Sequence, residues 1–260
     1  MRYHECAPPD AASDYVEALW VFDVAGLRDD SPRHIIVPDG TISLALIRLP
    51  GGPVHLSFSG PAPRVHQVEL LNNAVYGGIR LLPGAAGSVL KTNIEPSVGA
   101  FGPHIKPRPL ILNQLQSLIS PSADRSQIEG LLKKMALFVA AQAASPDETV
   151  CALAAALAHA QGAQSISAFA QDRHISERQL RRRFKYQCGL TPKTFARLRR
   201  VRGACIDMVS TGRVDLAATS IKAGFCDQPH MGREFQSVFA GSAGMVNTYL
   251  HQRRSIEKPQ

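Results

Sequence analysis

The sequence lacks the cysteine spacing of a disulfide framework or of a zinc site. Its five cysteines are odd in number and scattered, and no two of them are spaced as C-x-x-C. Such a set favours a reducing compartment, where disulfides are rare. We therefore expect a cytoplasmic protein that needs no cofactor and no metal. The five residues are Cys6, Cys151, Cys188, Cys205 and Cys226.

Long apolar runs are also missing. No stretch approaches the roughly 20 apolar residues of a transmembrane helix. Charged and polar residues, Arg2, His4 and Glu5, stand at the N-terminus, and the apolar segment of a signal peptide does not follow them. The sequence therefore predicts no signal peptide and no association with a membrane.

Positive charge is present in excess, but only in one part of the chain. The 260 residues have a net charge of +8. Residues 161–260 hold 17 Lys and Arg against 7 Asp and Glu, whereas residues 1–160 hold 12 against 14. This asymmetry indicates a nucleic-acid-binding part joined to a part with another task. The hydrophobic share of 45% indicates a globular protein with a core.

The first hundred residues are rich in short β-strand patterns. Runs of β-branched and aromatic residues alternate with Pro and Gly, which is typical of a barrel or a sandwich. The expected strands cover residues 20–24, 33–37, 41–47, 54–58 and 74–82, and a short helix is expected before them at residues 12–19. We thus predict an α+β fold whose N-terminal domain, residues 1–120, is a β-rich, barrel-like (cupin-like) domain.

One turn between these strands has a specific signature. The sequence Pro38-Asp39-Gly40 separates two expected strands, and Asp and Gly tolerate the positive φ that tight turns need. We interpret Asp39 as an exposed turn residue with a structural role.

Residues 121–160 have the pattern of a helical linker. A capping-box sequence, S-Q-I-E, begins at Ser126, and apolar residues follow it at helical spacing. A second helix-start sequence, S-P-D-E, begins at Ser145. We expect a helical hairpin here, whose apolar stripes form either core or a dimer seam.

A basic helix dominates the C-terminal third. Ser176 is suited to cap it, and Leu180 and Phe184 stand four apart on one face, while arginines occupy the other faces. A shorter helix over residues 165–172 and a three-residue break precede it, which is the pattern of a helix-turn-helix unit. Taken alone, the basic helix is equally consistent with a solvated charged surface.

The same pattern occurs a second time, with helices expected over residues 214–223 and 227–239. Between the two units, Thr191-Pro192 starts a helix that can run to about residue 209. About 18 helical residues span roughly 27 Å, which is close to the 34 Å or so of one DNA turn. Two recognition helices held by this connector could therefore lie in adjacent major grooves.

Four motifs follow one another in this region. They are I-S-E-R-Q-L-R-R-R-F from Ile175, G-L-T-P-K-T-F from Gly189, R-R-V-R from Arg199 and A-G-F-C-D-Q-P-H-M-G-R-E-F from Ala223. Their succession resembles the DNA-binding domain of the AraC/XylS family of transcription regulators. The resemblance implies an AraC-type domain at residues 161–252, followed by a basic polar tail at 253–260. Residues 15–20 and 37–40 also resemble a β-rich domain that precedes this module in uncharacterised bacterial members.

The resemblance also implies positions that contact DNA. The residue types at these positions fit this role, because Arg suits guanine and Gln suits adenine. The expected base-reading residues are Arg178, Arg181, Arg182, Gln228, His230 and Arg233. The expected phosphate contacts are Ser176, Lys185, Lys193 and Arg213. Core positions are expected at Leu180, Phe184, Phe225, Met231 and Phe235. The implied partners are double-stranded DNA and RNA polymerase, with a small-molecule effector and a homodimer left open.

The second unit departs from the family pattern. Pro229 stands where a hydrogen-bonding side chain is common, and Gly232 weakens the helix by up to about 1 kcal/mol relative to Ala. The sequence A-G-S-A-G-M from Ala240 replaces the usual Gly-x-Ser-Pro turn. We therefore expect the first unit to dominate DNA binding.

The role of the N-terminal domain is left open between ligand sensing and protein interaction. Its aromatic residues Trp20, Phe22, Phe58 and Tyr76 form either a ligand pocket or plain core. The sequence also leaves open whether transcription is activated or repressed.

An enzyme is the alternative from another class, either a cupin-like metalloenzyme or a cysteine-based DNA-repair alkyl acceptor. The histidines His34, His55, His66 and His104 are too scattered to form an H-x-H metal cluster. Cys6 has no cationic or metal-binding neighbours in sequence that would activate its thiol. We therefore predict that the protein is not an enzyme.

Overall fold

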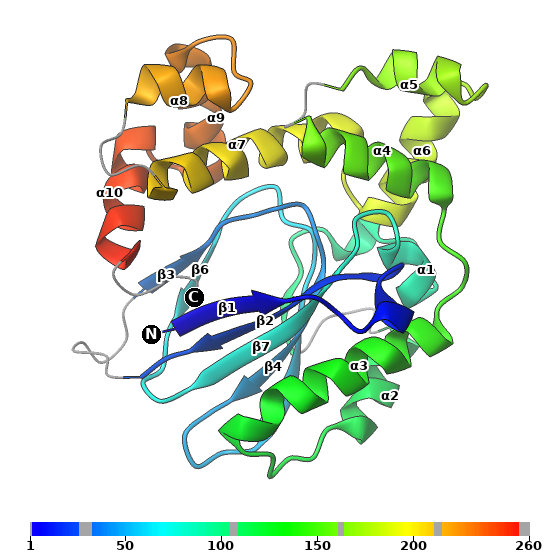
Figure 1. Cartoon of the computed structure of the whole chain (residues 1–260), viewed down its shortest axis with the longest axis vertical. Helices are drawn as coiled ribbons and strands as arrows, with labels where there is room; N and C mark the ends of the chain where they lie inside the picture. The colour runs from blue at the N-terminus through cyan, green and yellow to red at the C-terminus, as the bar shows by residue number, and fades with distance from the viewer. Residues whose placement is uncertain (1, 26–32, 104–108, 161–163, 211–214, 255–260) are drawn as a thin grey trace.

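The computed structural model describes residues 2–25, 33–103, 109–160, 164–210 and 215–254 of the chain. Within these ranges no helix is long and apolar enough to span a bilayer. The chain forms a β-rich part, residues 2–142, and a helical part, residues 147–254. The long helix α7 passes across one end of the sheet, with α5 and α6 toward one of its ends and α8 to α10 toward the other (Figure 1).

Two antiparallel sheets make up the β-rich part. The larger has six strands in the order β1-β2-β7-β4-β5-β8, and the smaller pairs β3 with β6. The strands are β1 (Arg2–Cys6), β2 (Val16–Asp23), β3 (Arg33–Ile36), β4 (Ser43–Arg48), β5 (Val54–Ser59), β6 (His66–Glu69), β7 (Val75–Leu81) and β8 (Phe101–Gly102). The prediction of a β-rich N-terminal fold is confirmed. We call the β3 and β6 pair the ribbon.

The prediction of a helix at residues 12–19 is wrong. The chain forms only a 3-10 turn, η1 (Asp10–Ala12), and strand β2 then begins at Val16. Strand β2 pairs with β1 on one side and with β7 on the other, so its backbone hydrogen bonds favour the strand over a short helix. The sequence did not predict β1 and β6, because each is short and has a largely polar or exposed pattern.

Three helices accompany the sheets: α1 (Ala86–Leu90), α2 (Leu110–Leu118) and α3 (Ile128–Gln142). Helix α3 packs its apolar stripe into the main core, together with strands β2, β4, β5 and β7. Gly77 makes this contact close, since a Cβ there would lie 2.9 Å from Ile128 Cγ2. The capping box before α3 lies two residues earlier than predicted. The Asp124 side chain accepts a hydrogen bond from the Gln127 backbone N–H, and the Asp124 backbone N–H donates to Gln127 Oε1.

In the helical part, the described residues form seven helices. They are α4 (Glu148–His159), α5 (Ile166–Asp172), α6 (Glu177–Cys188), α7 (Pro192–Ser210), α8 (Leu216–Lys222), α9 (Gln228–Phe239) and α10 (Ala243–Arg254). Helices α5 and α6 form the first pair, and α8 and α9 the second. All five expected core residues, Leu180, Phe184, Phe225, Met231 and Phe235, are buried.

Helix α7 contributes to two separate cores. Near its start, Phe195 packs edge-on against Phe184 of the first pair, with ring centroids 5.6 Å apart. Further along, Leu198 and Val201 pack with Phe235 in a second core that includes α8, α9 and α10. Each helix pair is therefore fixed to one part of the same rod.

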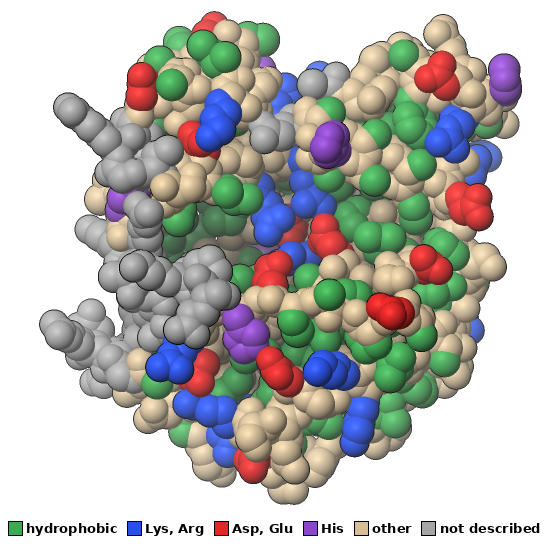
Figure 2. Space-filling view, in the orientation of Figure 1, with side chains coloured by type: hydrophobic (Ala, Val, Ile, Leu, Met, Phe, Trp, Pro, Cys, Tyr) green, Lys and Arg blue, Asp and Glu red, His purple; other side chains and the backbone are tan. Residues whose placement is uncertain are grey.

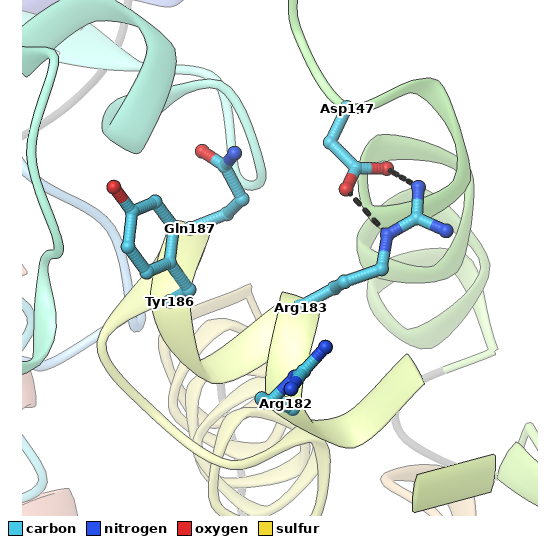
Figure 3. A pocket seen from close by; sticks show the side chains of 5 residues that line it. All are labelled: Asp147, Arg182, Arg183, Tyr186 and Gln187. Atoms are coloured by element: carbon cyan, nitrogen blue, oxygen red, sulfur yellow. Dashed lines mark hydrogen bonds and ion pairs between the residues drawn. The ribbon is translucent and has the colours of Figure 1, made fainter. Parts of the chain in front are cut away.

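The two helices of the expected linker pack into different cores. Helix α3 belongs to the core of the sheets, whereas Val150, Leu153 and Leu157 of α4 pack against the first pair. A salt bridge adds to this attachment (Figure 3). Asp147 caps α4 by accepting from the Val150 N–H, and it also binds Arg183 of α6 through Nε at 2.7 Å and Nη2 at 2.5 Å.

The β-rich part and the helical part are docked on each other at both ends of α7. At the first pair, the Ile94 N–H donates to the Tyr186 carbonyl at 3.0 Å. At the other end, the Val65 N–H donates to the Val238 carbonyl of α9 at 3.1 Å, and the Ile35 N–H donates to the Tyr249 hydroxyl of α10 at 2.8 Å. The ribbon and the residue before β6 thus hold α10 and α9, while the segment after α1 holds the first pair.

Replacing Asp147 by Ala should destabilise the protein by about 2 kcal/mol, because about 1 kcal/mol comes from the lost cap and a similar amount from the lost bidentate ion pair. Asp215 caps α8 by accepting from Ala217 and Ala218, and it serves as the matched control. The Asp215→Ala variant should lose only about 1 kcal/mol. Urea unfolding measures both values, and equal losses would show that the Arg183 ion pair contributes nothing.

Replacing Gly232 by Ala should stabilise α9 by up to about 1 kcal/mol, since glycine is the weaker helix former. A Cβ at this position meets nothing within 4 Å. Gly130 in α3 is equally open, and Gly130→Ala should give a similar gain. Thermal and urea unfolding of the two variants measure the change; a loss of stability at Gly232 would contradict the expectation.

Candidate nucleic-acid interface

The basic helix α6 is held by its ends and by one face. Its N-terminus has the predicted cap: Ser176 Oγ accepts from the Gln179 N–H at 3.2 Å, and the Ser176 N–H donates to Gln179 Oε1 at 3.3 Å. Leu180 and Phe184 are fully buried. Gly189 ends the helix with φ of 75°, a left-handed conformation that glycine adopts without strain. These anchors leave the arginine-bearing faces outward.

The three arginines expected to read bases in α6 lie on its exposed surface. Arg178, Arg181 and Arg182 are all exposed. Arg181 is paired with Glu177 one turn earlier, with Nε 2.6 Å from the carboxylate. In the described part of the chain, no ion pair involves Arg178 or Arg182. The structure therefore brings the three together on one accessible helix face.

Arg183, the neighbour of these arginines, has a different position. It lies beside Arg182 and Tyr186 around a shallow hollow, but its guanidinium turns toward Asp147 (Figure 3). The Asp147 hydrogen bond raises the pKa of Arg183 above its ordinary value. Arg183 is thus a structural residue within a run of three consecutive arginines that look alike in sequence.

Helix α9 presents fewer polar groups. Asp227 caps it by accepting from the His230 N–H at 2.6 Å, and Pro229 lies in the first turn. Gln228 and Arg233 are exposed. The His230 side chain is only 25% exposed, and its ring packs edge-on against Phe225 at 5.5 Å. Two of the three expected base readers of this helix therefore face outward, and the third is turned toward the core.

The expected phosphate contacts are dispersed. Ser176 uses its hydroxyl in the cap of α6. Lys185 is bound to Glu95 of the β-rich part, with Nζ 2.5 Å from the carboxylate, and Lys193 is exposed at the start of α7. Arg213 lies outside the described residues, as does His104, one of the four histidines considered for a metal site.

Two arginines of α7 have roles that the sequence analysis missed. Arg197 lies 3.5 Å from Glu234 of α9 and its Nη1 donates to Ser237 at 3.4 Å. Arg200 lies over the ring of Phe225 at 5.9 Å. Their spacing of three residues places them on one helix face, which was the available signal. Both hold the second pair against α7.

The aromatic residues expected to line a ligand pocket are only partly together. Phe22 is buried in a small cluster against which Trp20 and Tyr76 pack, and the rings of Phe22 and Tyr76 lie 6.3 Å apart. Phe58 is fully buried in the main core instead. Among the described residues, no three or more His, Cys, Asp or Glu side chains are grouped so that they could hold a metal ion.

Comparison with known proteins gives one match in sequence and several weak likenesses in structure. Residues 169–247 match the family model of a helix-turn-helix domain. No curated protein matches the chain.

Solved structures that resemble the chain include several of ToxT from Vibrio cholerae. ToxT from strain O395 has 9% identity and a TM-score of 0.42, and the match covers 96% of this chain and 95% of that one. The P21 form at 1.65 Å has 10% identity, a TM-score of 0.42 and 96% coverage of both chains. Wild-type ToxT from strain SCE256 with bound unsaturated fatty acid has 10% identity, a TM-score of 0.38 and coverage of 95% and 93%. These scores are too low to support an inference about function.

The family match falls on the part of the chain that carries the four motifs. It begins within α5 and ends within α10, and so it includes the basic helix, the connecting helix and the second pair. The predicted resemblance is confirmed there: residues 169–247 form a helix-turn-helix domain of the AraC type, a DNA-binding domain of transcription regulators.

Proposed function

We propose that the protein is a sequence-specific transcription regulator that reads two adjacent major grooves with α6 and α9. The observation that carries this proposal is the construction of the helical part. Two short helix pairs, each with its own capped second helix, are fixed to one rod. The 19 residues of α7 span about 28 Å at 1.5 Å each, which suits a DNA repeat of about 34 Å.

Within this function, α6 is the main reading helix. Arg178 and Arg182 are exposed and can present a bidentate guanidinium to guanine O6 and N7. Arg181 would first exchange its carboxylate partner Glu177 for DNA. Helix α9 contributes Gln228 and Arg233, while His230 supports the helix from within.

The regulatory part is proposed to end with α3, and α4 to act with the DNA-binding part. This division follows the packing, since α4 shares its core with α5 and α6. The cluster of Trp20, Phe22 and Tyr76 is the proposed site for a small-molecule effector. RNA polymerase and a second copy of the chain are further proposed partners, because a regulator acts through the first and paired operators favour the second.

The proposed role is binding and not catalysis. For the alternative of an alkyl acceptor, a lowered thiol pKa would be needed. Burial and the nearby Glu129 instead raise the pKa of Cys6, and burial raises the pKa of Cys151 to about 11. Neither thiol is activated.

Replacing Arg182 by Ala should weaken binding to a specific operator by about 1–3 kcal/mol, because one bidentate base contact is lost. Binding to random duplex DNA should change much less. The operator is first obtained by selecting duplexes from a random pool with the wild-type chain, and affinities are then measured by fluorescence anisotropy. Arg2→Ala, an exposed arginine of β1, is the control of equal charge and should leave both affinities unchanged. Equal losses on the two DNAs would rule out a base-reading role for Arg182.

Replacing Lys193 by Ala should weaken binding to operator and random DNA alike, since a phosphate contact carries no sequence information. The slope of log affinity against log salt should become shallower by about 1. Titrations at four salt concentrations measure this slope. A loss confined to the operator would assign Lys193 to base reading instead.

A further inference from the structure

The turn at residues 38–40 is pressed against the connecting helix α7. Gly40 has φ of +78°, and a Cβ there would lie 2.7 Å from Cδ2 of Phe195 and 3.6 Å from Leu190 Cδ1. Only glycine meets both the conformation and the space. The turn therefore serves as a docking point of the β-rich part on the helical part, in addition to connecting β3 and β4.

The sequence analysis interpreted Asp39 as an exposed turn residue, and this is wrong. Its side chain is only 16% accessible, because the turn is covered by α7. It accepts from the Thr41 N–H at 2.9 Å and from the Thr41 hydroxyl at 2.6 Å, and it lies 3.2 Å from Arg80 Nε. Burial would raise the pKa of Asp39, but the charges of Arg80, Arg202 and Arg199 hold it below its usual range. Two of these three cations belong to α7, so the carboxylate compensates charge from the helical part.

Arg199 depends on this compensation. It is only 7% exposed, and its Nε and Nη2 have no hydrogen-bond partner among the described groups. Its nearest carboxylate oxygen, on Glu17, is 3.7 Å away, and its guanidinium lies 4.9 Å from the ring centre of Phe195. Burial accordingly lowers the pKa of Arg199. A buried charge with so few direct bonds is costly unless opposite charge stays close.

Acidic and basic side chains gather in the hollow between the two parts (Figure 2). Around Asp39 and Arg199 they include Glu5 and Glu17 from the β-rich part and Arg202 from α7. This contact is therefore electrostatic and partly desolvated. Its stability changes sharply if one charge is removed, because the remaining charges stay buried without a counterpart.

Docking also occupies the recognition helix. Glu95 binds the ammonium group of Lys185, and the Ile94 N–H binds the carbonyl of Tyr186 next to it. A carboxylate at that position repels a DNA phosphate. The docked β-rich part thus takes up one of the cationic groups proposed to bind the DNA backbone.

We propose that the turn at residues 38–40 is an intramolecular latch that restrains DNA binding: the packing of Gly40 on Phe195 and the negative charge of Asp39 near the cations of α7 hold the helical part docked, and release of this contact frees Lys185 of α6 from Glu95. The restraint rests on the proposed function, whereas the latch itself is a property of the fold.

Two backbone amides report the state of the latch in the full-length chain. The Ile94 N–H is bound to the first pair and the Val65 N–H to the second, so both should exchange with solvent faster when the two parts separate. Asp39→Asn and Gly40→Val should each accelerate exchange at both amides by about tenfold or more. They should also tighten binding to the selected operator by about threefold or more, since a larger fraction of the protein is competent.

Gly51→Val is the matched control for Gly40→Val. Gly51 also has a positive φ, of +66°, but a Cβ there meets nothing within 4 Å. This variant should leave the exchange of both amides and the DNA affinity unchanged. In the double variant Asp39→Asn with Arg199→Met, one buried cation of α7 is removed together with the carboxylate that compensates it, and exchange should return toward the wild-type rate.

Unchanged exchange in Asp39→Asn and Gly40→Val would overturn the latch. Faster exchange with equal or weaker DNA affinity would overturn the restraint. If the wild-type chain and every variant fail to bind DNA, the proposed function fails and the restraint fails with it, while the exchange rates still confirm or overturn the latch.

Discussion

The structure depends on one helix that belongs to two cores. Phe195 of α7 is packed with the first helix pair, and Leu198 and Val201, only one and two turns later, are packed with the second. Neither pair could bury its apolar side by itself, since each consists of two short helices. The rod therefore supplies hydrophobic surface to both pairs and fixes the distance between them. Stability and the spacing of α6 and α9 are thus set by the same residues.

Arginine has three distinct tasks in the helical part, although the sequence shows it in similar runs. Arg178 and Arg182 stay exposed, Arg183 and Arg197 tie helices together through carboxylates, and Arg199 is buried against the β-rich part. Burial is what separates these tasks. A run of charged residues does not by itself reveal which of them are buried. The Asp and Glu side chains that pair with Arg183 and Arg197 lie far away in sequence.

The sequence predicted most of the helical part, since its signals are local. The cap at Ser176 and the helix expected over residues 227–239 follow from local side chains, and the structure has both. Prediction was poorer where long-range pairing decides. The segment after Asp10 became strand β2 because β1 and β7 flank it, and Asp39 became buried because α7 covers its turn. Which exposed side chains touch DNA stays a prediction, because it depends on a partner molecule.

The contacts between the β-rich part and the helical part form a closed ring. Val65, next to the ribbon, holds α9, and Ile35 of the ribbon holds α10. Helix α7 joins these helices to the first pair, which is bound back to the β-rich part at Ile94. The segment between α3 and α4 adds a further tie, since the Ala144 N–H donates to the Ser88 carbonyl at 3.1 Å. Because these contacts form a closed ring, a rotation of one helix pair strains the contacts of the other. Each helix pair is therefore restrained from two sides, by α7 and by the β-rich part, so neither can tilt without disturbing contacts of the other.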